Sequence, residues 1–455
     1  RGQNGVTDTT IYTYFGQKYP EGTKFYNNIK DFFRTGFNQK QNLSFEGGSD
    51  KINYRVSASY NTNQGFVPNS DQVKWNLSSA ITSQLSDKIK IDESLNYTND
   101  NVDGVFKGSI GPMLGLLVWP VTDDASVYLN PDGSKRKVFT SEGFDNPYFS
   151  VNKNFTKDVT NRLTNVTNLS YDATSWLRFV GKFGFDTYSS NKTILKHPES
   201  VLANTIGGSI DELETNSINY SLEYLADINK KIGDFKIDFK VGGSVIDQYS
   251  KSVGGYGERF LDPSFLKLNA VTKTTYKSQT TVRERRLVGA LGILNINYKG
   301  IVNLQVNGRN DWSSTLAPDR NSFFYPGVNG AFIISELPYL KSIHWLTFAK
   351  LRGAYAIARK DPAPYSLYPV LESQSTTSGG FLYGFTGPNP LLKPEKTSSF
   401  EVGGEARVFD NRLAVDVSYY KKTSIDQIMT GVRMSYATGF ILNNLNGGTL
   451  WNSGL

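Results

Sequence analysis

The sequence of 455 residues contains no cysteine and only two histidines. The lack of cysteine excludes disulfides, thiolate catalysis and cysteine-ligated metal sites, and it is compatible with an exported protein that manages without disulfides. His197 and His344 lie far apart in the sequence, with no pair of acidic residues beside either. They therefore predict neither a metal site nor an acid–base pair. No GxSxG, Walker or HExxH pattern occurs, so we expect no catalytic residue, no metal, no cofactor and no enzyme activity.

Long hydrophobic runs are also missing. No stretch approaches the ~18 consecutive apolar residues of a transmembrane helix, which excludes a helical membrane protein. A strong charge of one sign is missing too, since 49 basic residues face 42 acidic ones for a net charge of +7. These charges are scattered along the chain and mixed in sign, which favours a solvated surface over a nucleic-acid partner.

Alternating polar and apolar residues are what the sequence has in abundance. The pattern is clearest in two stretches joined at Asp410-Asn411, where both side chains tolerate the backbone angles of a tight turn. One face of the first stretch carries Phe400, Val402, Gly404, Ala406 and Val408, and one face of the second carries Leu413, Val415, Val417 and Tyr419. Alternation longer than an ordinary strand is typical of membrane barrels, where lipid-facing and lumen-facing residues alternate. Aromatic residues make up 13% of the chain, as the interfacial girdles of such barrels require.

Roughly fifteen strands follow the same period-2 pattern, and their connections are of two lengths. Short turns are predicted at 48–50, 86–88, 231–234, 299–300 and 410–411. Longer segments alternate with them. They are predicted at 99–160, from the end of the hairpin 161–186 to about 216, at 249–284 and at 361–396. We read residues 1–40 as a loop region leading into the barrel and residues 41–455 as barrel strands. Because outer-membrane barrels have short periplasmic turns and longer extracellular loops, we expect Asn130, Ser209, Tyr256 and Ser373 to lie outside the cell.

Two motifs carry a resemblance to a known family. Asn389, Pro390, Pro394 and Glu395, followed by Glu401 and Gly403, resemble the "NP-L-PE…E-G" signature of TonB-dependent outer-membrane transporters. Arg309, Asp311, Ser313 and Ser314, followed by the segment to residue 336, resemble the "R-DGSS" region of their SusC/RagA-type branch, with Trp312 where that branch usually has glycine. The block 42–66 is similar to the early barrel of the same branch.

The resemblance implies an all-β, transmembrane antiparallel β-barrel of twenty-two strands with an N-terminal plug. We expect the plug and the TonB box to lie outside this chain, which on this reading is truncated at both ends of the barrel. The implied function is TonB-dependent import of a bulky nutrient, a glycan or a peptide, across the bacterial outer membrane. The implied partners are a SusD-like surface lipoprotein, TonB-ExbB-ExbD through a segment outside this chain, and outer-membrane lipid with lipopolysaccharide. No nucleic acid is expected.

Other functions stay open at this point. A passive porin or a secretion-associated barrel scaffold would have the same strands, and a soluble carbohydrate-binding β-protein would share the alternation. The long segments contain aromatic residues that can stack on sugar rings or pack against a partner, since aromatic rings combine large area with a polar handle. These candidate substrate-binding residues are Trp119, Tyr128, Tyr148, Tyr256, Tyr365, Tyr368 and Tyr383. Packing of a loop on itself is an equally good interpretation.

The longest predicted segment also contains an apolar run, residues 113–120. Contiguous apolar surface left in water usually marks an interface. Two locations suit the run: the inside of the barrel against the plug, or the contact with a surface lipoprotein. We expect the long loops together to seat such a lipoprotein over the lumen.

Overall fold

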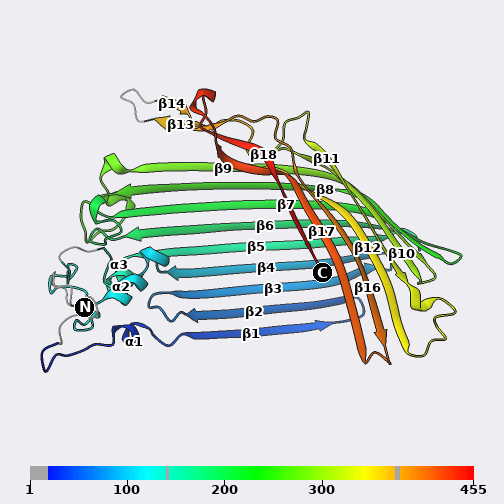
Figure 1. Cartoon of the computed structure of the whole chain (residues 1–455), viewed down its shortest axis with the longest axis horizontal. Helices are drawn as coiled ribbons and strands as arrows, with labels where there is room; N and C mark the ends of the chain where they lie inside the picture. The colour runs from blue at the N-terminus through cyan, green and yellow to red at the C-terminus, as the bar shows by residue number, and fades with distance from the viewer. Residues whose placement is uncertain (1–18, 140–142, 375–379) are drawn as a thin grey trace, which may run out of the picture.

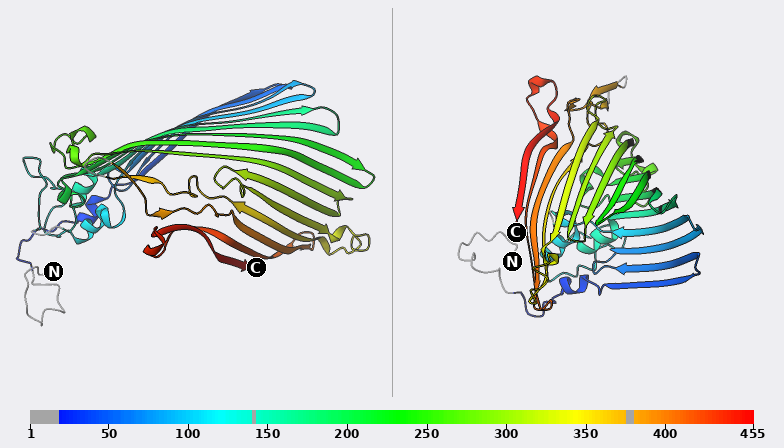
Figure 2. Two further views of the ribbon diagram at one scale, coloured as in Figure 1. Left: turned by 90° about the horizontal axis from the view of Figure 1, so that it is seen from above. Right: turned by 90° about the vertical axis from the view of Figure 1, so that its right-hand side faces the viewer.

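The computed structural model describes residues 19–139, 143–374 and 380–455. In this part of the chain the main element is one sixteen-stranded sheet, accompanied by a two-stranded sheet of β13 and β14. The large sheet curves like part of a barrel wall and is open between β1 and β18 (Figure 2). No helix of the described residues is long and apolar enough to cross a membrane.

The large sheet is an antiparallel meander, in which each strand pairs with the strand that follows it in sequence (Figure 1). The meander continues to β12, which pairs with β16, and then through β17 to β18, beside which the short β15 lies parallel. The strands are β1 (Phe37–Gly48), β2 (Ile52–Gln64), β3 (Asp71–Ser86), β4 (Ile89–Gly104), β5 (Phe155–Asp172), β6 (Leu177–Lys196), β7 (Ser209–Ile232), β8 (Phe235–Glu258), β9 (Lys277–Tyr298), β10 (Val302–Ser313), β11 (Ser322–Ile333), β12 (Leu346–Lys360), β13 (Leu371–Gln374), β14 (Gly380–Tyr383), β15 (Thr386–Gly387), β16 (Glu395–Val408), β17 (Leu413–Arg433) and β18 (Leu442–Gly454).

The helices of the described chain are short and lie outside the strands, in the connections or, for α1, before β1. The α-helices are α1 (Asn28–Phe32), α2 (Pro112–Val118) and α3 (Pro147–Lys153), and they gather at the end of the sheet where the long loops lie (Figure 1). The 3-10 turns are η2 (Gly108–Ile110), η3 (Asn204–Ile206), η4 (Leu268–Ala270), η5 (Lys273–Thr275), η6 (Ile334–Glu336) and η7 (Tyr436–Thr438).

The register of the sheet sorts side chains into two contrasting faces. Leu222 pairs with Val245, which pairs with Val288, so that apolar residues of β7, β8 and β9 form one row. Residues at the intervening positions are polar, and Lys240 Nζ lies 3.8 Å from the Asp227 carboxylate across the neighbouring strand. The apolar face suits lipid and the polar face suits a wet lumen, which confirms the alternation predicted from the sequence.

Aromatic residues mark both edges of the apolar face. Tyr171 and Phe179 stack with ring centroids 6.5 Å apart beside a short turn, and Tyr60 and Trp75 lie 4.5 Å apart toward the long-loop end. Trp312 belongs to the apolar rows because it pairs with Val288, and it is 42% exposed. Aromatic girdles of this kind are anchored at the two membrane interfaces. The tryptophan that replaces the family's usual glycine is therefore part of the outer face of the wall.

The strands of the middle of the sheet extend further than the sequence predicts. β8 ends at Glu258 and β9 begins at Lys277, so the loop between them is 259–276 and not 249–284. The loop between β6 and β7 is 197–208, whereas the sequence placed a long segment up to about 216. β1 begins at Phe37, inside the region assigned to a leading loop, and residues 1–18 of that region lie outside the described residues. These extensions are rich in Ser, Thr, Asn and charged residues on both faces. The alternation of polar and apolar residues therefore fades in the sequence, although the strands remain paired.

The tightest turns lie at one end of the sheet and the longest connections at the other (Figure 1), although the β11–β12 connection, 334–345, is a longer segment at the short-turn end and the β2–β3 connection, 65–70, is a short one at the long-loop end. The tight turns rely on left-handed backbone, with φ of +52° at Lys299, +75° at Gly300 and +57° at Asp410. Asn, Asp and Gly accept this conformation most readily. The longest connection, 105–154, lies at the opposite end and carries α2 and α3.

Cysteine labelling in intact bacteria tests the orientation of this sheet. Because the sequence has no native cysteine, single Asn130→Cys and Lys299→Cys variants report on one site each, and both residues are exposed. We expect a membrane-impermeant maleimide to label Asn130→Cys in intact cells and Lys299→Cys only after the outer membrane is disrupted. The reverse pattern would contradict the assignment of the long loops to the cell exterior.

Candidate functional site

The rim that carries the long loops is a folded layer with its own apolar core. Phe32 of α1, Leu116 of α2 and Val151 of α3 are buried against one another. The apolar run 113–120 therefore divides, since Leu116 and Trp119 are buried whereas Leu114 and Leu117 stay exposed, Leu117 to 70%. One side of α2 seals the rim and the other remains an open apolar surface.

A buried ion pair within the connection 105–154 lies where this connection meets a second loop of the rim. Lys135 Nζ lies 2.7 Å from Asp145 Oδ1, and both side chains are almost completely buried. The Asp145 carboxylate also accepts hydrogen bonds from the Ser200 hydroxyl and, at 3.0 Å, from the backbone N–H of Val201. The backbone N–H of Lys135 donates to Glu199. These bonds hold the connection 105–154 against the connection 197–208.

His197 belongs to the same buried layer. Its backbone N–H donates to Asn154 Oδ1 at 2.8 Å, and its ring lies edge-on to Phe149 with centroids 5.4 Å apart. Burial lowers the pKa of His197, with a smaller opposing effect from Glu199. A neutral, packed imidazole is a structural residue. Within the described ranges no group of three or more His, Asp or Glu side chains is placed to hold a metal ion.

The candidate aromatic residues of the first long loop are occupied by its own packing. Trp119 is 6% exposed, and its indole N–H donates to Asp123 Oδ2 at 3.0 Å. Tyr148 lies on α3, donates its hydroxyl to the backbone oxygen of Asp31 at 3.0 Å, and has the ring of Tyr128 stacked 6.5 Å away. For these residues the structural interpretation left open by the sequence is the better one.

The other aromatic candidates differ among themselves. Tyr256 lies on β8 and not in a loop, and its hydroxyl donates to Glu258 Oε1 at 2.6 Å. Tyr365, Tyr368 and Tyr383 are exposed on the connection between β12 and β16. This connection, residues 361–394, is called the strap below. Ser373, which we expected outside the cell, lies on β13 within the strap.

The Arg309–Ser314 motif lies on the polar face beside the anchor of the strap and contributes Ser313 to it. Arg285 of β9 forms two 2.8 Å hydrogen bonds with the Asp361 carboxylate, which also accepts from the hydroxyls of Ser313 and Thr315. The strap thus begins on residues of β9 and β10, although it leaves the sheet from β12. Burial raises the pKa of Asp361, but the hydrogen bonds from Arg285 and Ser313 outweigh it and leave that pKa below its usual value.

The remaining residues of this motif brace the wall beside the anchor. Arg309 Nε lies 2.8 Å from Asp311 Oδ1, and its Nη2 donates to the Ser244 hydroxyl at 2.8 Å. Asp311 is buried and also accepts from the Tyr325 hydroxyl. The Ser314 hydroxyl accepts from the backbone N–H of Arg286.

The motif that begins at Asn389 fixes the other end of the strap. Asn389 Nδ2 donates to the backbone oxygen of Asn444 on β18 at 2.7 Å, and Lys393 N donates to Asn446 Oδ1 at 2.7 Å. Leu392, between them, is fully buried against Ala317 and Leu367. Pro390 and Pro394 flank this contact, the former exposed and the latter buried.

Glu395, Glu401 and Gly403 act where the strap becomes β16. Glu395 Oε1 accepts from the backbone N–H of Ile428 at 2.9 Å, next to a register shift in the β17–β18 ladder. Glu401 lies 3.7 Å from Arg352 on the polar face. A Cβ at Gly403 would come within 2.6 Å of the Ser418 hydroxyl, so glycine gives Arg352 room to reach Ser418 and Asp416.

Sequence reasoning missed Arg285, Asp361, Lys135 and Asp145. Arg285 and Asp361 are far apart in the sequence, and Lys135 and Asp145 are ten residues apart in one connection, so no local pattern predicts either pair. Both motifs were found, but their residues were recognised by resemblance and their structural work, anchoring the two ends of the strap, was not foreseen.

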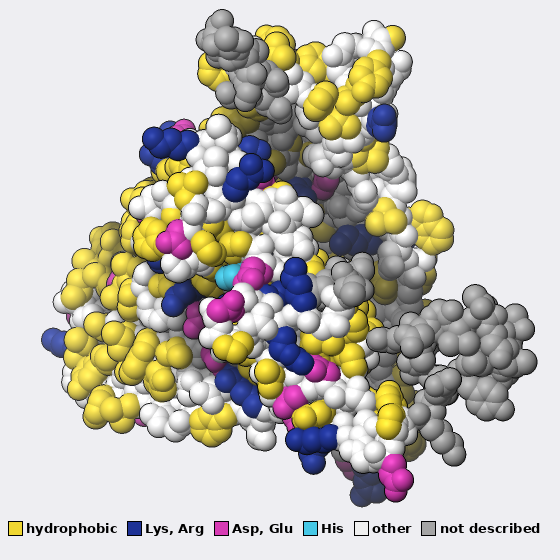
Figure 3. All heavy atoms as spheres, turned by 90° about the vertical axis from the view of Figure 1, so that its left-hand side faces the viewer, with side chains coloured by type: hydrophobic (Ala, Val, Ile, Leu, Met, Phe, Trp, Pro, Cys, Tyr) yellow, Lys and Arg dark blue, Asp and Glu magenta, His cyan; other side chains and the backbone are white. Residues whose placement is uncertain are grey.

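The loop-bearing end of the molecule shows apolar, basic and acidic side chains intermixed over its surface (Figure 3). No single-sign field dominates this face, in agreement with the scattered charges of the sequence. Mixed charge of this kind is unlike the single-sign field of a polyanion-binding surface.

A long, lipid-facing antiparallel wall with a looped outer rim defines an outer-membrane β-barrel. Residues 119–455 match the family model "TonB dependent receptor-like, beta-barrel", and the chain belongs to this family. It is a protein of the bacterial outer membrane that crosses the membrane with strands.

Among individual proteins the chain is similar to the TonB-dependent receptor P26 of Formosa agariphila, 24% identical over 424 residues that cover 90% of this chain and 42% of the relative. It is also similar to the TonB-dependent receptor SusC of Bacteroides thetaiotaomicron, 24% identical over 461 residues that cover 93% of this chain and 44% of SusC. The chain thus spans less than half the length of these curated relatives.

The fold matches that of the RagAB peptide transporter with a TM-score of 0.80 and 19% identity, covering 98% of this chain and 51% of the matched one. The ferripyoverdine receptor of Pseudomonas aeruginosa matches less closely, with a TM-score of 0.57 and 13% identity, over 92% of this chain and 52% of that one. The likeness extends over nearly the whole sheet and supports the barrel architecture.

Proposed function

We propose that this chain is the barrel part of a TonB-dependent importer that takes a bulky nutrient, an oligosaccharide or a peptide, across the outer membrane. The observation that carries the proposal is the combination of a lipid-facing wall with a polar inner face onto which the strap is fastened at both ends. TonB-ExbB-ExbD would act through a segment outside the described chain. The importer would move its substrate without changing it chemically.

A surface lipoprotein similar to SusD is the partner we propose for the rim. Support comes from the similarity to SusC and from the exposed side of α2, where Leu114, Leu117 and Val118 are each more than 40% exposed. Apolar side chains clustered on a folded layer indicate a protein interface. The buried pair Lys135–Asp145 keeps this surface in one arrangement, as a docking face requires.

The alternative functions differ from an importer in their need for energised uptake and for an apolar outer face. A passive porin or a secretion-associated scaffold needs no energised uptake, and a soluble carbohydrate-binding protein needs no apolar outer face. The apolar rows of the sheet disfavour the soluble alternative. Dependence of uptake on TonB distinguishes the importer from the porin and the scaffold.

Charged substitutions on α2 test the docking surface. We expect Leu114→Glu/Leu117→Glu in the full-length protein to lower co-purification of the lipoprotein about tenfold, because two carboxylates would be buried unpaired in the contact. Growth on the imported polymer should fall with it, while the amount of barrel in the outer membrane stays unchanged.

Tyr339→Glu is the matched control for these variants. Tyr339 is 70% exposed on the β11–β12 connection at the opposite rim. The Tyr339→Glu substitution should leave co-purification of the lipoprotein and growth on the polymer unchanged. If the α2 variants also leave both unchanged, α2 has no role in the partner contact.

A further inference from the structure

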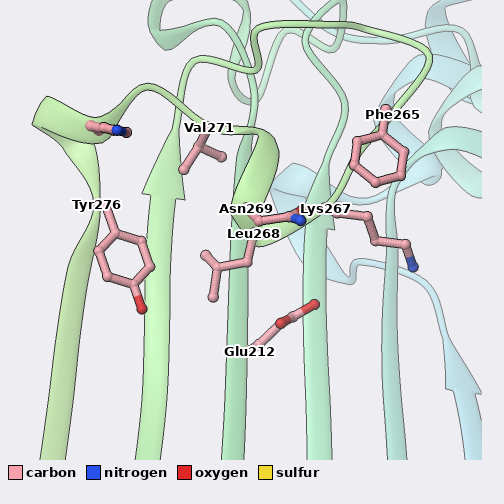
Figure 4. Close-up of a pocket in the computed structure, with 8 residues that line it drawn as sticks. Glu212, Phe265, Lys267, Leu268, Asn269, Val271 and Tyr276 are labelled. Atoms are coloured by element: carbon pink, nitrogen blue, oxygen red, sulfur yellow. The ribbon is translucent and has the colours of Figure 1, made fainter.

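A pocket of about 590 Å³ lies under the β8–β9 connection. It is lined by Glu212 of β7 and by residues of the 259–276 connection, as Figure 4 shows. Its lining residues are Glu212, Phe265, Lys267, Leu268, Asn269, Val271, Lys273 and Tyr276. None of them belongs to the family motifs or to the strap.

The register places this pocket on the outside of the wall. Glu212 pairs with Gly255, and counting back along the same ladder by twos leads to the lipid-facing pair Leu222 and Val245 without a register shift. On the same face Tyr220 pairs with Asp247, whose carboxylate bonds Arg286; the next outward pair is Ile218 with Tyr249, and the pair beyond it, Asn216 with Lys251, is polar. Eight residues of a tilted strand place Glu212 roughly 20 Å above that ion pair. The pocket therefore opens outward, above the membrane surface.

The pocket is built into the fold, and two glycines make it possible. A Cβ at Gly255 would lie 2.5 Å from Leu268 Cδ2, and one at Gly257 would lie 2.4 Å from Val271 Cγ2. Val271 is buried together with Leu195 and Ile210 of the neighbouring strands. The connection thus lies flat on the outer face of the wall.

Hydrogen bonds fix the connection in that position. Leu261 N donates to Ala270 O at 2.8 Å, and Thr272 N donates to Arg259 O at 2.9 Å. The Thr275 hydroxyl donates to Glu258 O at 2.6 Å at the end of β8. The lining side chains are consequently held by ordered backbone.

The lining combines charge, hydrogen-bonding groups and ring faces. Within the described part of the chain, Lys267, Lys273 and Glu212 form no ion pair, and Asn269 adds an amide. Phe265 and Tyr276 are about half exposed and border the pocket from opposite sides (Figure 4). Aromatic faces suit sugar rings, a carboxylate and an amide suit hydroxyls, and two lysines against one glutamate favour an anionic ligand.

We propose that this pocket binds an anionic saccharide, and that its place on the outer wall directs it to the core sugars of the outer-leaflet glycolipid. The site is separate from the lumen and from the α2 surface. It rests on the outer-membrane location of the chain and is independent of the import proposal. The same chemistry would accept a soluble anionic saccharide, so the experiment separates the two sources.

The test uses the full-length protein purified in detergent, with three probes: lipopolysaccharide that carries its core, lipid A without core, and the freed core oligosaccharide. For wild type we expect binding of the core-bearing lipid to be about tenfold tighter than binding of lipid A, and Lys267→Ala/Lys273→Ala to remove that difference. Tyr276→Ala should weaken binding as well. Lys192→Ala, an exposed lysine at the same height on the opposite face, should change nothing.

Binding of the core-bearing lipid above lipid A assigns the site to the membrane glycolipid. Binding of the free oligosaccharide with no preference between the two lipids assigns it to a soluble saccharide. Equal affinities of wild type and the lysine variant for all three probes would overturn the site. Unchanged thermal unfolding of the variants is the measurement that distinguishes a lost ligand from a displaced connection, and the charge-conserving Lys267→Arg/Lys273→Arg variant should retain binding.

Discussion

Val417→Arg is expected to lower the free energy of unfolding in lipid by ~2–4 kcal/mol, the effect of arginine near the bilayer midplane of a barrel's lipid face. Val417 is half exposed in the row formed with Leu413, Val415 and Tyr419. It pairs with Gly404 of β16, so a long side chain there has no neighbouring carboxylate on its own face within the ladder. Urea unfolding of the reconstituted full-length protein measures the change.

Ala414→Arg is the control for this substitution. Ala414 is exposed on the polar face of the same strand, where Asp416 and Arg352 already form an ion pair. It should cost well under 1 kcal/mol, because the lumen is wet. Ser418, on the same polar face, is a less suitable control position, because its hydroxyl accepts a hydrogen bond from Arg352. Equal effects at Val417 and Ala414 would contradict the assignment of the two faces.

Arg285→Ala is expected to release the start of the strap, at a cost of about 3–5 kcal/mol, because it leaves the Asp361 carboxylate buried without its cation. Asp361 is 9% exposed and Arg285 22%, so solvent screens this pair far less than a surface pair. Hydrogen exchange and limited proteolysis of residues 361–394 report the release, while the ladder of β1 to β8 should keep its protection.

Acid should weaken the same anchor. The folded pKa of Asp361 lies below its unfolded value. The carboxylate therefore stabilises the folded anchor above the unfolded pKa of about 3.9, and that contribution is lost as the pH falls through the folded pKa.

Asp234→Ala is the control for Arg285→Ala. It breaks the exposed pair with Lys299 and should cost at most about 1 kcal/mol. Unaltered exchange of the strap in Arg285→Ala, or equal effects of the two variants, would exclude the anchor.

The sequence was sufficient to predict the wall of the barrel but not what is fastened to it. Rows such as Leu413, Val415 and Val417 alternate with polar residues because one face of the wall meets lipid and the other meets water. The pattern of a single strand is therefore enough to predict both the strand and its two faces. The turn residues at Lys299-Gly300 and Asp410-Asn411 were equally readable, since left-handed backbone needs particular side chains.

Outside the membrane the same reasoning failed for a physical reason. Above the apolar rows both faces of β7 and β8 meet water or loops, so the extension from Tyr249 to Glu258 lost its contrast and was read as loop. The pair Arg285–Asp361 joins residues brought together only by the sheet, which is why a candidate site built from local patterns contained aromatic residues such as Trp119 that are buried in loop packing.

The order of strands has a consequence for how this sheet is assembled. Up to β12 every strand pairs with its predecessor, so most pairings close a local connection and the sheet can grow hairpin by hairpin. β5 and β16 are the exceptions, because β5 has to find β4 across residues 105–154 and β16 has to find β12 across the strap. The hydrogen bonds of Asn389 and Lys393 reach β18, and so they form only after the β17–β18 hairpin is in place. Interactions that form this late act on the rate at which the finished sheet comes apart rather than on the rate at which it grows.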